Sequence, residues 1–300
     1  MRVVVALGGN ALLRRGEKPD ASVQLEHVQV AAHALAPLAR EHELLICHGN
    51  GPQVGLLALE SEADRSLSRA YPLDALVAQT QGMIGYWLVQ SLRNAGVAKP
   101  AVGVVTQVLV SAEDPAFVLP TKFVGAVYDH QAATGLATAR GWSIAADGDN
   151  WRRVVPSPDP LGLVEQGTIL SLLAAGTVVV CGGGGGAPVV SESGQLRGVE
   201  AVVDKDLVSS LLAVSVKADR LLVLTDVPAV MRDYGTATAA ALDRVTLAEL
   251  STMTFPAGSM GPKIEACRRF VSAADGVAAV GALADAESIL AGSAGTTITR

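Results

Sequence analysis

The sequence predicts an α/β fold in which helices surround a mainly parallel sheet. Three observations lead to this expectation. Short runs rich in Val, Ile and Leu alternate with longer segments of helical periodicity, an order typical of parallel sheets. The runs are almost continuously apolar, as expected of strands covered on both faces. Glycine-rich turns directly follow several runs, at the carboxyl strand ends where such folds bind ligands.

Strands and helices are expected to alternate along the chain. The expected strands are residues 2–7, 43–47, 101–109, 177–181, 220–225, 277–280 and 296–299. The expected helices are residues 22–40, 50–62, 73–95, 161–175, 204–217, 260–274 and 284–291. In segment 204–217 the apolar residues fall on one helical face, which is typical of a helix packed on a sheet. Residues 187–199 are expected to form a hairpin.

Residues 111–160 interrupt this alternation. The segment contains five prolines and the turn-like run Asp147-Gly148-Asp149-Asn150. Long irregular segments in compact folds are more often functional than not. We therefore expect an inserted subdomain that acts as a lid, and an irregular surface excursion without function is the alternative.

Composition narrows the class of protein. Half of the residues are hydrophobic, 17% are charged and the net charge is −6, so we expect no nucleic-acid partner, which would require a basic patch. The three cysteines match neither a disulfide framework nor a zinc pattern, and we expect buried thiols. The first apolar run is too short for a signal peptide and no run reaches membrane length. We expect a cytoplasmic protein without membrane contact.

Glycine-rich turns follow three different expected strands. Gly8-Gly9-Asn10 follows the first strand, Gly49-Asn50-Gly51 follows the second, and the glycine run 182–186 follows the strand 177–181. Glycine allows the backbone to approach an anion closely and to direct successive N–H groups at it. One such turn is equally typical of a plain strand–helix connection. Three together favour a ligand rich in phosphate.

Two common nucleotide motifs do not fit the glycine run. A phosphate-binding loop of the Walker type requires a lysine after its glycines, whereas Ala187-Pro188 follows here. The run formally matches a dinucleotide fingerprint, and Asp204 and Asp206 lie about 20 residues further on. That fingerprint also requires a helix to begin at the glycines. Residues 188–194 instead have the pattern of a strand and a turn, so a dinucleotide-binding dehydrogenase is disfavoured.

Lysines are rare in this chain, which contains six lysines and seventeen arginines. Lys122, Lys205 and Lys263 lie in segments rich in Pro or Gly or flanked by acids. Lys205 and Lys263 begin expected helices, where a cation opposes the helix dipole. An anion between lysine and helix end would remove this conflict. For any one lysine alone, a solvated side chain is the favoured interpretation, but the set favours compact charges placed for a purpose.

These residue types suit phosphoryl transfer, which requires positioning and charge neutralisation. Asp206 is expected to orient a lysine, and Asp226 follows the strand 220–225 at the same sheet edge. A helix cap remains the alternative for Asp206. Acidic residues also bind Mg²⁺, although Mg²⁺ often relies mainly on phosphates and water, and no metal ligand is assigned.

Taken together, these segments resemble the carbamate kinases of the amino acid kinase family over nearly the whole chain. The matching motifs are Val5-Ala6-Leu7-Gly8-Gly9-Asn10-Ala11-Leu12, His48-Gly49-Asn50-Gly51-Pro52-Gln53-Val54-Gly55, Gln81-Gly82-Met83-Ile84-Gly85-Tyr86, Glu113-Asp114-Pro115-Ala116-Phe117, Pro120-Thr121-Lys122, Arg152-Arg153-Val154-Val155-Pro156-Ser157-Pro158, residues 182–186, Val203-Asp204-Lys205-Asp206 and residues 258–263. So many motifs in the same order are far more specific than any one of them.

The resemblance implies one domain over 1–300 with a three-layer αβα sandwich, a protruding lid of about 111–160 and a homodimer. It implies an N-terminal lobe, 1–200, for carbamate or carbamoyl phosphate and a C-terminal lobe, 201–300, for ATP or ADP with Mg²⁺. By match, the substrate-binding residues are Gly8, Gly9, Asn10, Gly49, Asn50 and Gly51. The catalytic residues are Lys122, Lys205, Asp206 and Lys263. The nucleotide-binding residues are Lys205, Thr225, Asp226, Met231, Gly258, Ser259, Met260 and Lys263.

Ala6 separates subfamilies, because relatives that phosphorylate amino acid carboxylates usually carry a lysine at this place. Phe123 and Ala126 stand where the family usually has proline, Asp149-Asn150 replaces a more Gly- and Arg-rich run, and Met231 replaces an aromatic residue. None of these differences removes a proposed catalytic residue. Two alternatives remain open: a sibling kinase for another small acid or phosphate, and a nucleotide-binding regulator without catalysis.

Overall fold

The computed structural model describes residues 1–14, 16–255 and 259–300. Its main sheet has the strand order β15–β17–β16–β12–β1–β2–β9–β3, and only the pair β16–β17 is antiparallel. The strands are β1 (Arg2–Leu7), β2 (Glu43–His48), β3 (Ala101–Gly103), β9 (Val178–Val180), β12 (Arg220–Thr225), β15 (Arg244–Thr246), β16 (Val277–Ala282) and β17 (Thr296–Thr299). The prediction of a mainly parallel sheet is confirmed.

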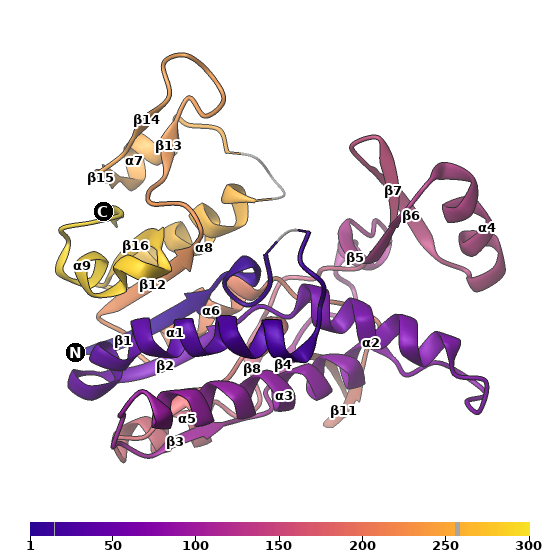
Figure 1. Ribbon diagram of the computed structural model, residues 1–300, viewed down its shortest axis with the longest axis horizontal. Coiled ribbons are helices and arrows are strands. Elements are labelled where there is room, and N and C mark those ends of the chain that lie inside the picture. Colours follow the sequence, from indigo (N-terminus) through magenta and orange to yellow (C-terminus); the bar gives the residue numbers. More distant parts are fainter. Residues whose placement is uncertain (15, 256–258) are drawn as a thin grey trace.

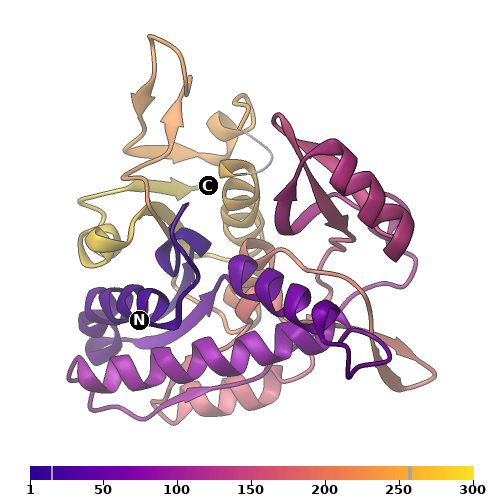
Figure 2. The ribbon, with the colours of Figure 1, turned by 45° about the vertical axis from the view of Figure 1, so that its right-hand side comes forward.

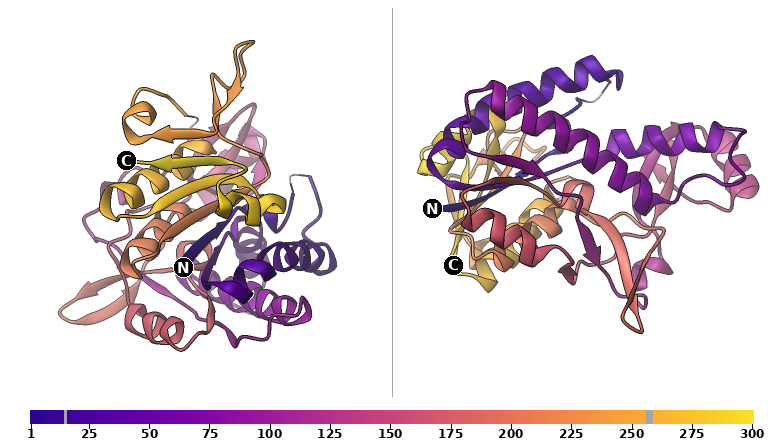
Figure 3. Two further views of the ribbon diagram at one scale, coloured as in Figure 1. Left: turned by 90° about the vertical axis from the view of Figure 1, so that its left-hand side faces the viewer. Right: turned by 90° about the horizontal axis from the view of Figure 1, so that it is seen from below.

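Helices cover both faces of this sheet, which gives the three layers visible in Figure 3. One face carries α1 (Ala21–Glu41), α3 (Leu73–Asn94) and α9 (Ala286–Ala291), and the other carries α5 (Gln166–Ala174), α6 (Lys205–Ser215) and α8 (Met260–Ala273). The side chains of β1 alternate between the layers: Val3 and Val5 belong to the first core and Val4 to the second. Burial on both faces explains why these strands are continuously apolar.

A second, four-stranded sheet corrects two boundaries expected from sequence. It has the order β11–β10–β4–β8, with β4 (Gln107–Leu109), β8 (Gly162–Leu163), β10 (Ala187–Glu192) and β11 (Gln195–Gly198). The expected single strand 101–109 is therefore wrong, because the chain leaves the main sheet after β3 and the carbonyl of Thr106 accepts from Ala187 N–H at 2.9 Å. The expected helix 161–175 begins only at Gln166, because its first residues pair with β4. The predicted hairpin is confirmed as β10–β11.

A subdomain projects from one end of the molecule (Figures 1 and 2). It consists of the antiparallel sheet β5–β7–β6 and one helix, with β5 (Lys122–Tyr128), α4 (His130–Arg140), β6 (Ser143–Asp147) and β7 (Asn150–Val155). Gly125 lies in a β-bulge of β5 with a positive φ of 78°. A Cβ atom on Gly55 would lie 3.0 Å from the Cα of Gly125, so these glycines bring the subdomain close to α2 (Gly51–Ala63).

The remaining elements are short. They are α7 (Leu247–Leu250), the hairpin β13 (Met231–Arg232) with β14 (Ala240–Ala241), and the 3₁₀ turns η1 (Gly9–Ala11), η2 (Pro115–Phe117), η3 (Gly183–Gly185) and η4 (Leu283–Asp285). Among the described residues, no helix combines the length and the apolar character needed to cross a bilayer. The three cysteines are free and buried, as expected.

Leu88 on α3 is fully buried between that helix and the sheet. We predict that Leu88→Ala lowers the free energy of unfolding by about 2–5 kcal/mol, because the core cannot close the cavity completely. Leu196 on β11 is 45% exposed, and Leu196→Ala is the matched control, expected to change it by less than about 1 kcal/mol. Denaturant unfolding measures both, and equal losses would contradict this account of the core.

Candidate active site

The three glycine-rich turns predicted from sequence meet at one edge of the main sheet. They follow β1, β2 and β9, which are neighbours in the sheet. A Cβ atom on Gly49 would lie 3.0 Å from the Cα of Gly9. In the third turn, a Cβ atom on Gly183 would overlap the ring of His48, and one on Gly184 would overlap the side chain of Asn50. Only glycine permits this packing of three turns around two polar side chains.

Some backbone N–H groups of these turns are used within the protein. Gly8 N–H donates to the carbonyl of Leu224 at 2.8 Å, and Gly49 N–H donates to the carbonyl of Leu7 at 3.2 Å. Gly8 and Gly49 therefore act by bringing backbones together. The next turn residues lead directly into α2, whose first helical residue is Gly51. The positive end of that helix faces the end of the sheet and attracts anions.

The glycine run 182–186 does not begin a helix. Gly182, Gly184, Gly185 and Gly186 all have positive φ angles between 64° and 88°, a backbone shape that other residues rarely adopt. The run continues into β10 rather than into a helix. The exclusion of a dinucleotide fingerprint from the pattern after the glycines is therefore confirmed.

A buried carboxylate joins two of the predicted lysines. Asp206 Oδ1 lies 2.6 Å from Lys205 Nζ, and Asp206 Oδ2 lies 3.1 Å from Lys263 Nζ. The side chains are 6% exposed for Asp206, 12% for Lys205 and 16% for Lys263. Lys205 begins α6 and Lys263 lies in the first turn of α8, so the carboxylate connects the starts of both helices. This anion offsets the conflict between each ammonium and its helix dipole.

The charges of this cluster stabilise one another. Burial would raise the pKa of Asp206, but Lys205 and Lys263 outweigh burial and lower that pKa to about 2. Burial would lower the pKa of Lys205, but Asp206 raises it above its ordinary value. Asp206 is therefore ionised and Lys205 is charged at neutral pH, as a site that binds phosphate oxygens requires.

A second lysine–aspartate pair lies next to the first and involves a residue that sequence reasoning did not select. Lys122 Nζ at the start of β5 lies 2.6 Å from Asp204 Oδ2. Asp204 is the N-cap of α6, and its Oδ1 accepts from Asp206 N–H at 2.9 Å. The alternative that Asp206 caps the helix is wrong, because Asp204 occupies that position. An aspartate directly before an expected helix was a recognisable cap signal.

Buried polar side chains next to the glycine turns are held by hydrogen bonds. Asn50 Nδ2 donates to Thr80 Oγ1 at 2.8 Å, and Gln81 exchanges hydrogen bonds with the backbone of Thr106. His48 Nδ1 lies 2.9 Å from the carbonyl of Gly49. Burial lowers the pKa of His48 to about 4, so the ring is neutral at physiological pH and acts by its shape and its hydrogen bond. From the sequence, Asn50 is assigned to substrate binding and His48 and Gln81 are given only as parts of motifs, whereas Thr80 and Thr106 are not singled out.

The predicted nucleotide-binding residues lie on the C-terminal side of the site. Thr225 ends β12, and its hydroxyl donates to Asp226 Oδ1 at 3.0 Å. Ser259 and Met260 begin α8, and half-buried Met231 begins β13. Gly258 falls outside the described residues, as does the side chain of Asn10. The bond between Lys263 and Asp206 connects this side to the glycine turns.

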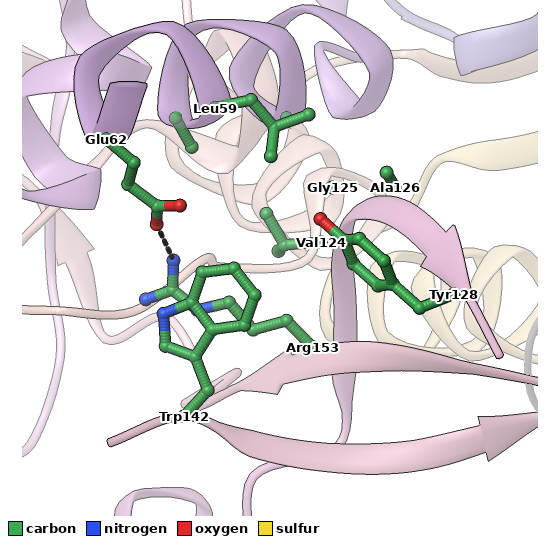
Figure 4. Close-up of a pocket in the computed structure, with 10 residues that line it drawn as sticks. Leu59, Glu62, Val124, Gly125, Ala126, Tyr128, Trp142 and Arg153 are labelled. Carbon is green, nitrogen blue, oxygen red and sulfur yellow. Dashed lines mark hydrogen bonds and ion pairs between the residues drawn. The ribbon is translucent and has the colours of Figure 1, made fainter. Parts of the chain in front are cut away.

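The subdomain is fixed to α2 by a cluster of charged and aromatic side chains (Figure 4). Glu62 on α2 forms ion pairs with Arg140 and with Arg153, the latter at 3.4 Å. The guanidinium carbons of both arginines lie 4.9 Å from the centre of the Trp142 ring. Arg153 also pairs with Glu200 at 3.0 Å. This cluster joins the subdomain to α2, and we call it the base of the subdomain.

A cavity of about 580 Å³ opens beside this base, between the subdomain and the segment 64–73. It lies apart from the lysine cluster.

One sequence difference from the family also has a local explanation: the guanidinium of Arg152 lies 5.4 Å from the centre of the Phe123 ring, so the aromatic ring packs against that arginine.

Within the described residues, no group of three or more His, Cys, Asp or Glu side chains is arranged as a metal cage. Both oxygens of Asp206 already contact ammonium groups. This donor set fits a metal ion that arrives bound to phosphates and keeps water ligands, which is the usual behaviour of Mg²⁺.

Asp206→Asn should expose the energetic role of the cluster. Removing one partner of a buried ion pair costs about 3–5 kcal/mol in unfolding free energy. Because the folded-state pKa of Asp206 lies below its unfolded value, its contribution is present above pH ~4 and is lost as the pH falls toward ~2. Urea unfolding across this pH range, with exposed Asp149→Asn as control, tests the prediction. A variant as stable as the wild type at pH 7 would refute it.

Comparison with known proteins agrees with this geometry. The amino acid kinase family profile matches residues 1–280. Relatives named carbamate kinase include those of Rhizobium meliloti, 50% identical with 99% of this chain and 93% of the relative covered, and Escherichia coli K12, 47% identical with 99% and 98% covered. A solved carbamate kinase from Giardia lamblia bound to AMP-PNP superposes with a TM-score of 0.91 at 38% identity, covering 99% of this chain and 98% of its own. This chain belongs to the amino acid kinase family and, within it, to the carbamate kinases.

Proposed function

We propose that this chain catalyses reversible phosphoryl transfer between carbamoyl phosphate and ADP, forming ATP and carbamate, which breaks down to ammonia and CO₂. The observation that carries the proposal is the carboxylate of Asp206 between the ammonium groups of Lys205 and Lys263. This cluster lies at the carboxyl edge of the sheet, where three glycine turns meet. Membership of the carbamate kinases supports the same reaction.

The proposed mechanism depends on charge and position. The acyl–oxygen–phosphorus link of carbamoyl phosphate breaks at the P–O bond, and a terminal phosphate oxygen of ADP forms the new P–O bond. Lys205 and Lys263 stabilise the negative charge of the transferring group and of the adjoining phosphate. Asp206 keeps both ammonium groups in place. Such preorganised donors are effective because they need no rearrangement during the reaction.

The two sides of the site are assigned to different substrates. We assign carbamoyl phosphate to the side of Gly9, Asn50 and Gly51, where the start of α2 attracts anions. Ala6 leaves this side without the lysine of relatives that act on amino acid carboxylates. The nucleotide is assigned to the side of Thr225 and α8, together with Asp226, Met231, Ser259 and Met260. The AMP-PNP bound to the Giardia lamblia enzyme supports nucleotide use.

We propose that Mg²⁺ accompanies the nucleotide. When bound, it would neutralise charge on the nucleotide phosphates. No residue of the chain is assigned as its ligand. All other charge stabilisation in the proposed mechanism comes from the lysines and the helix termini.

The division of the chain follows from this assignment. We propose a substrate lobe over 1–200, a nucleotide lobe over 201–300, and a lid within 111–160 that carries Lys122 to the site. The observed subdomain, residues 122–155, lies inside that segment. We also propose a cytoplasmic location, where ADP and ATP are abundant.

Lys205→Ala and Lys263→Ala should each lower the rate of ATP formation from ADP, Mg²⁺ and carbamoyl phosphate by roughly a hundredfold or more. Each removes a donor to the transferring group, a loss worth about 3–4 kcal/mol in the barrier. Lys99→Ala is the control, because Lys99 bonds to the carbonyl of His42 before β2, at the opposite edge of the sheet. A coupled hexokinase assay follows the ATP formed.

Turnover of another acyl phosphate with none of carbamoyl phosphate would refute the proposed substrate. Full activity of Lys205→Ala would refute the proposed site. Binding of ADP without any phosphoryl transfer by the wild type would instead indicate a nucleotide-binding regulator.

We further propose a homodimer. The main sheet ends in the short edge strand β3, and Tyr86 on neighbouring α3 is 60% exposed, a residue type that is frequent in interfaces. Sedimentation equilibrium should give a mass of about 61 kDa, twice the 30.7 kDa of one chain. A mass near that of one chain at micromolar concentration would contradict the dimer.

A further inference from the structure

The carboxylate of Asp204 has two partners from distant parts of the chain. Its Oδ1 accepts from the backbone N–H of Asp206 at 2.9 Å, which caps α6. Its Oδ2 lies 2.6 Å from Lys122 Nζ, at the first residue of β5 in the subdomain. One side chain therefore links the helix that begins with Lys205 to the lysine that the subdomain contributes.

The surroundings of Asp204 hold this carboxylate in a fixed position. Val202 N–H donates to the carbonyl of Pro156, just after the last strand of the subdomain, at 2.9 Å. The carbonyl of Val203 packs so closely against Gly185 that a side chain there would overlap it. The Asp204 side chain is only 15% exposed, whereas that of Lys122 is 36% exposed. The aspartate is thus the more buried partner, and the longer lysine side chain is the more exposed one.

We propose that Asp204 is a positioning residue for the phosphoryl-transfer reaction: through the ion pair at the start of β5, it holds the Lys122 ammonium beside the Lys205–Asp206–Lys263 cluster. This inference rests on the proposed function and adds a residue to it. Lysine side chains are flexible, and a catalytic ammonium needs a partner that restricts its position. The carboxylate supplies that restriction from the start of α6, which also carries Lys205 and Asp206.

The helix cap and the ion pair are separable by substitution. In Asp204→Asn, the amide oxygen still accepts from Asp206 N–H, because asparagine caps helices about as well as aspartate. The amide nitrogen then faces the Lys122 ammonium, so two donors meet and the attraction is lost. Asp204→Asn therefore removes the ion pair and keeps α6 capped, whereas Asp204→Ala removes both.

The test is a double-mutant cycle of Asp204→Asn and Lys122→Ala, measured as kcat and KM for ATP formation. We expect Asp204→Asn to lower kcat by roughly tenfold to hundredfold, because misplacing a catalytic group by about 1 Å costs up to about 10²-fold. KM should change less than kcat, and thermal stability should stay close to wild type. In the Lys122→Ala background, Asp204→Asn should have no further effect on kcat.

Asp129→Asn is the matched control, because Asp129 caps α4 of the same subdomain through its bond from Ala132 N–H at 2.7 Å. It should keep wild-type kcat. The proposal is overturned if Asp204→Asn keeps wild-type kcat, or if it lowers kcat equally with and without Lys122. It is also overturned if Asp204→Ala loses activity while Asp204→Asn keeps it, since the cap would then be the whole role of Asp204.

A second readout does not depend on the reaction. Amide hydrogen exchange in β5 of the substrate-free protein should be faster in Asp204→Asn than in the wild type, and the substitution should add nothing in the Lys122→Ala background. If the wild type does not turn over carbamoyl phosphate, the proposed function fails, while this exchange measurement still decides whether Asp204 holds Lys122. Unchanged exchange in Asp204→Asn overturns the proposed contact.

Discussion

The carboxylate of Asp206 is the constraint on which the rest of the site depends. It is 6% exposed and contacts one ammonium from α6 and one from α8. Burial would lower the pKa of Lys205, and Asp206 is the partner that raises that pKa above its ordinary value. The starts of two helices that lie far apart in sequence are thereby held at one edge of the sheet. A compact group of charges follows, fixed before any ligand binds.

The glycines allow three turns to pack closely together, in addition to any role in binding an anion. The turns follow β1, β2 and β9, which are consecutive in the sheet, and so they lie close together. A side chain on Gly49 would crowd the backbone of Gly9. Side chains on Gly183 and Gly184 would overlap the His48 ring and the Asn50 amide. Two of the turn N–H groups are consumed by bonds to Leu224 and Leu7. These two N–H groups are not available to an anion. Anion attraction at this edge therefore depends mainly on the starts of helices and on the lysines.

Two of the contacts between the subdomain and the rest of the chain differ in character. At its base, Glu62, Arg153 and Trp142 form a cluster of ion pairs and ring contacts with α2. At the start of β5, one ion pair joins Lys122 to Asp204. Because Lys122 is joined to the site by an ion pair while the base is fixed to α2, small movements of the subdomain would change the place of the Lys122 ammonium.

The sequence by itself determined the α/β class, the glycine turns at strand ends and the selection of Lys205, Lys263 and Asp206, because hydrophobic period, glycine placement and rare lysines are local properties of the chain. It did not determine that residues 101–109 divide between two sheets, nor that Lys122 meets the carboxylate of Asp204. Both depend on hydrogen bonds between residues far apart in sequence: Ala187 N–H donates to the carbonyl of Thr106, and Lys122 Nζ donates to Asp204 across 82 positions. Only the folded chain brings those donors and acceptors together, and so only the tertiary structure decided which carboxylate meets which lysine.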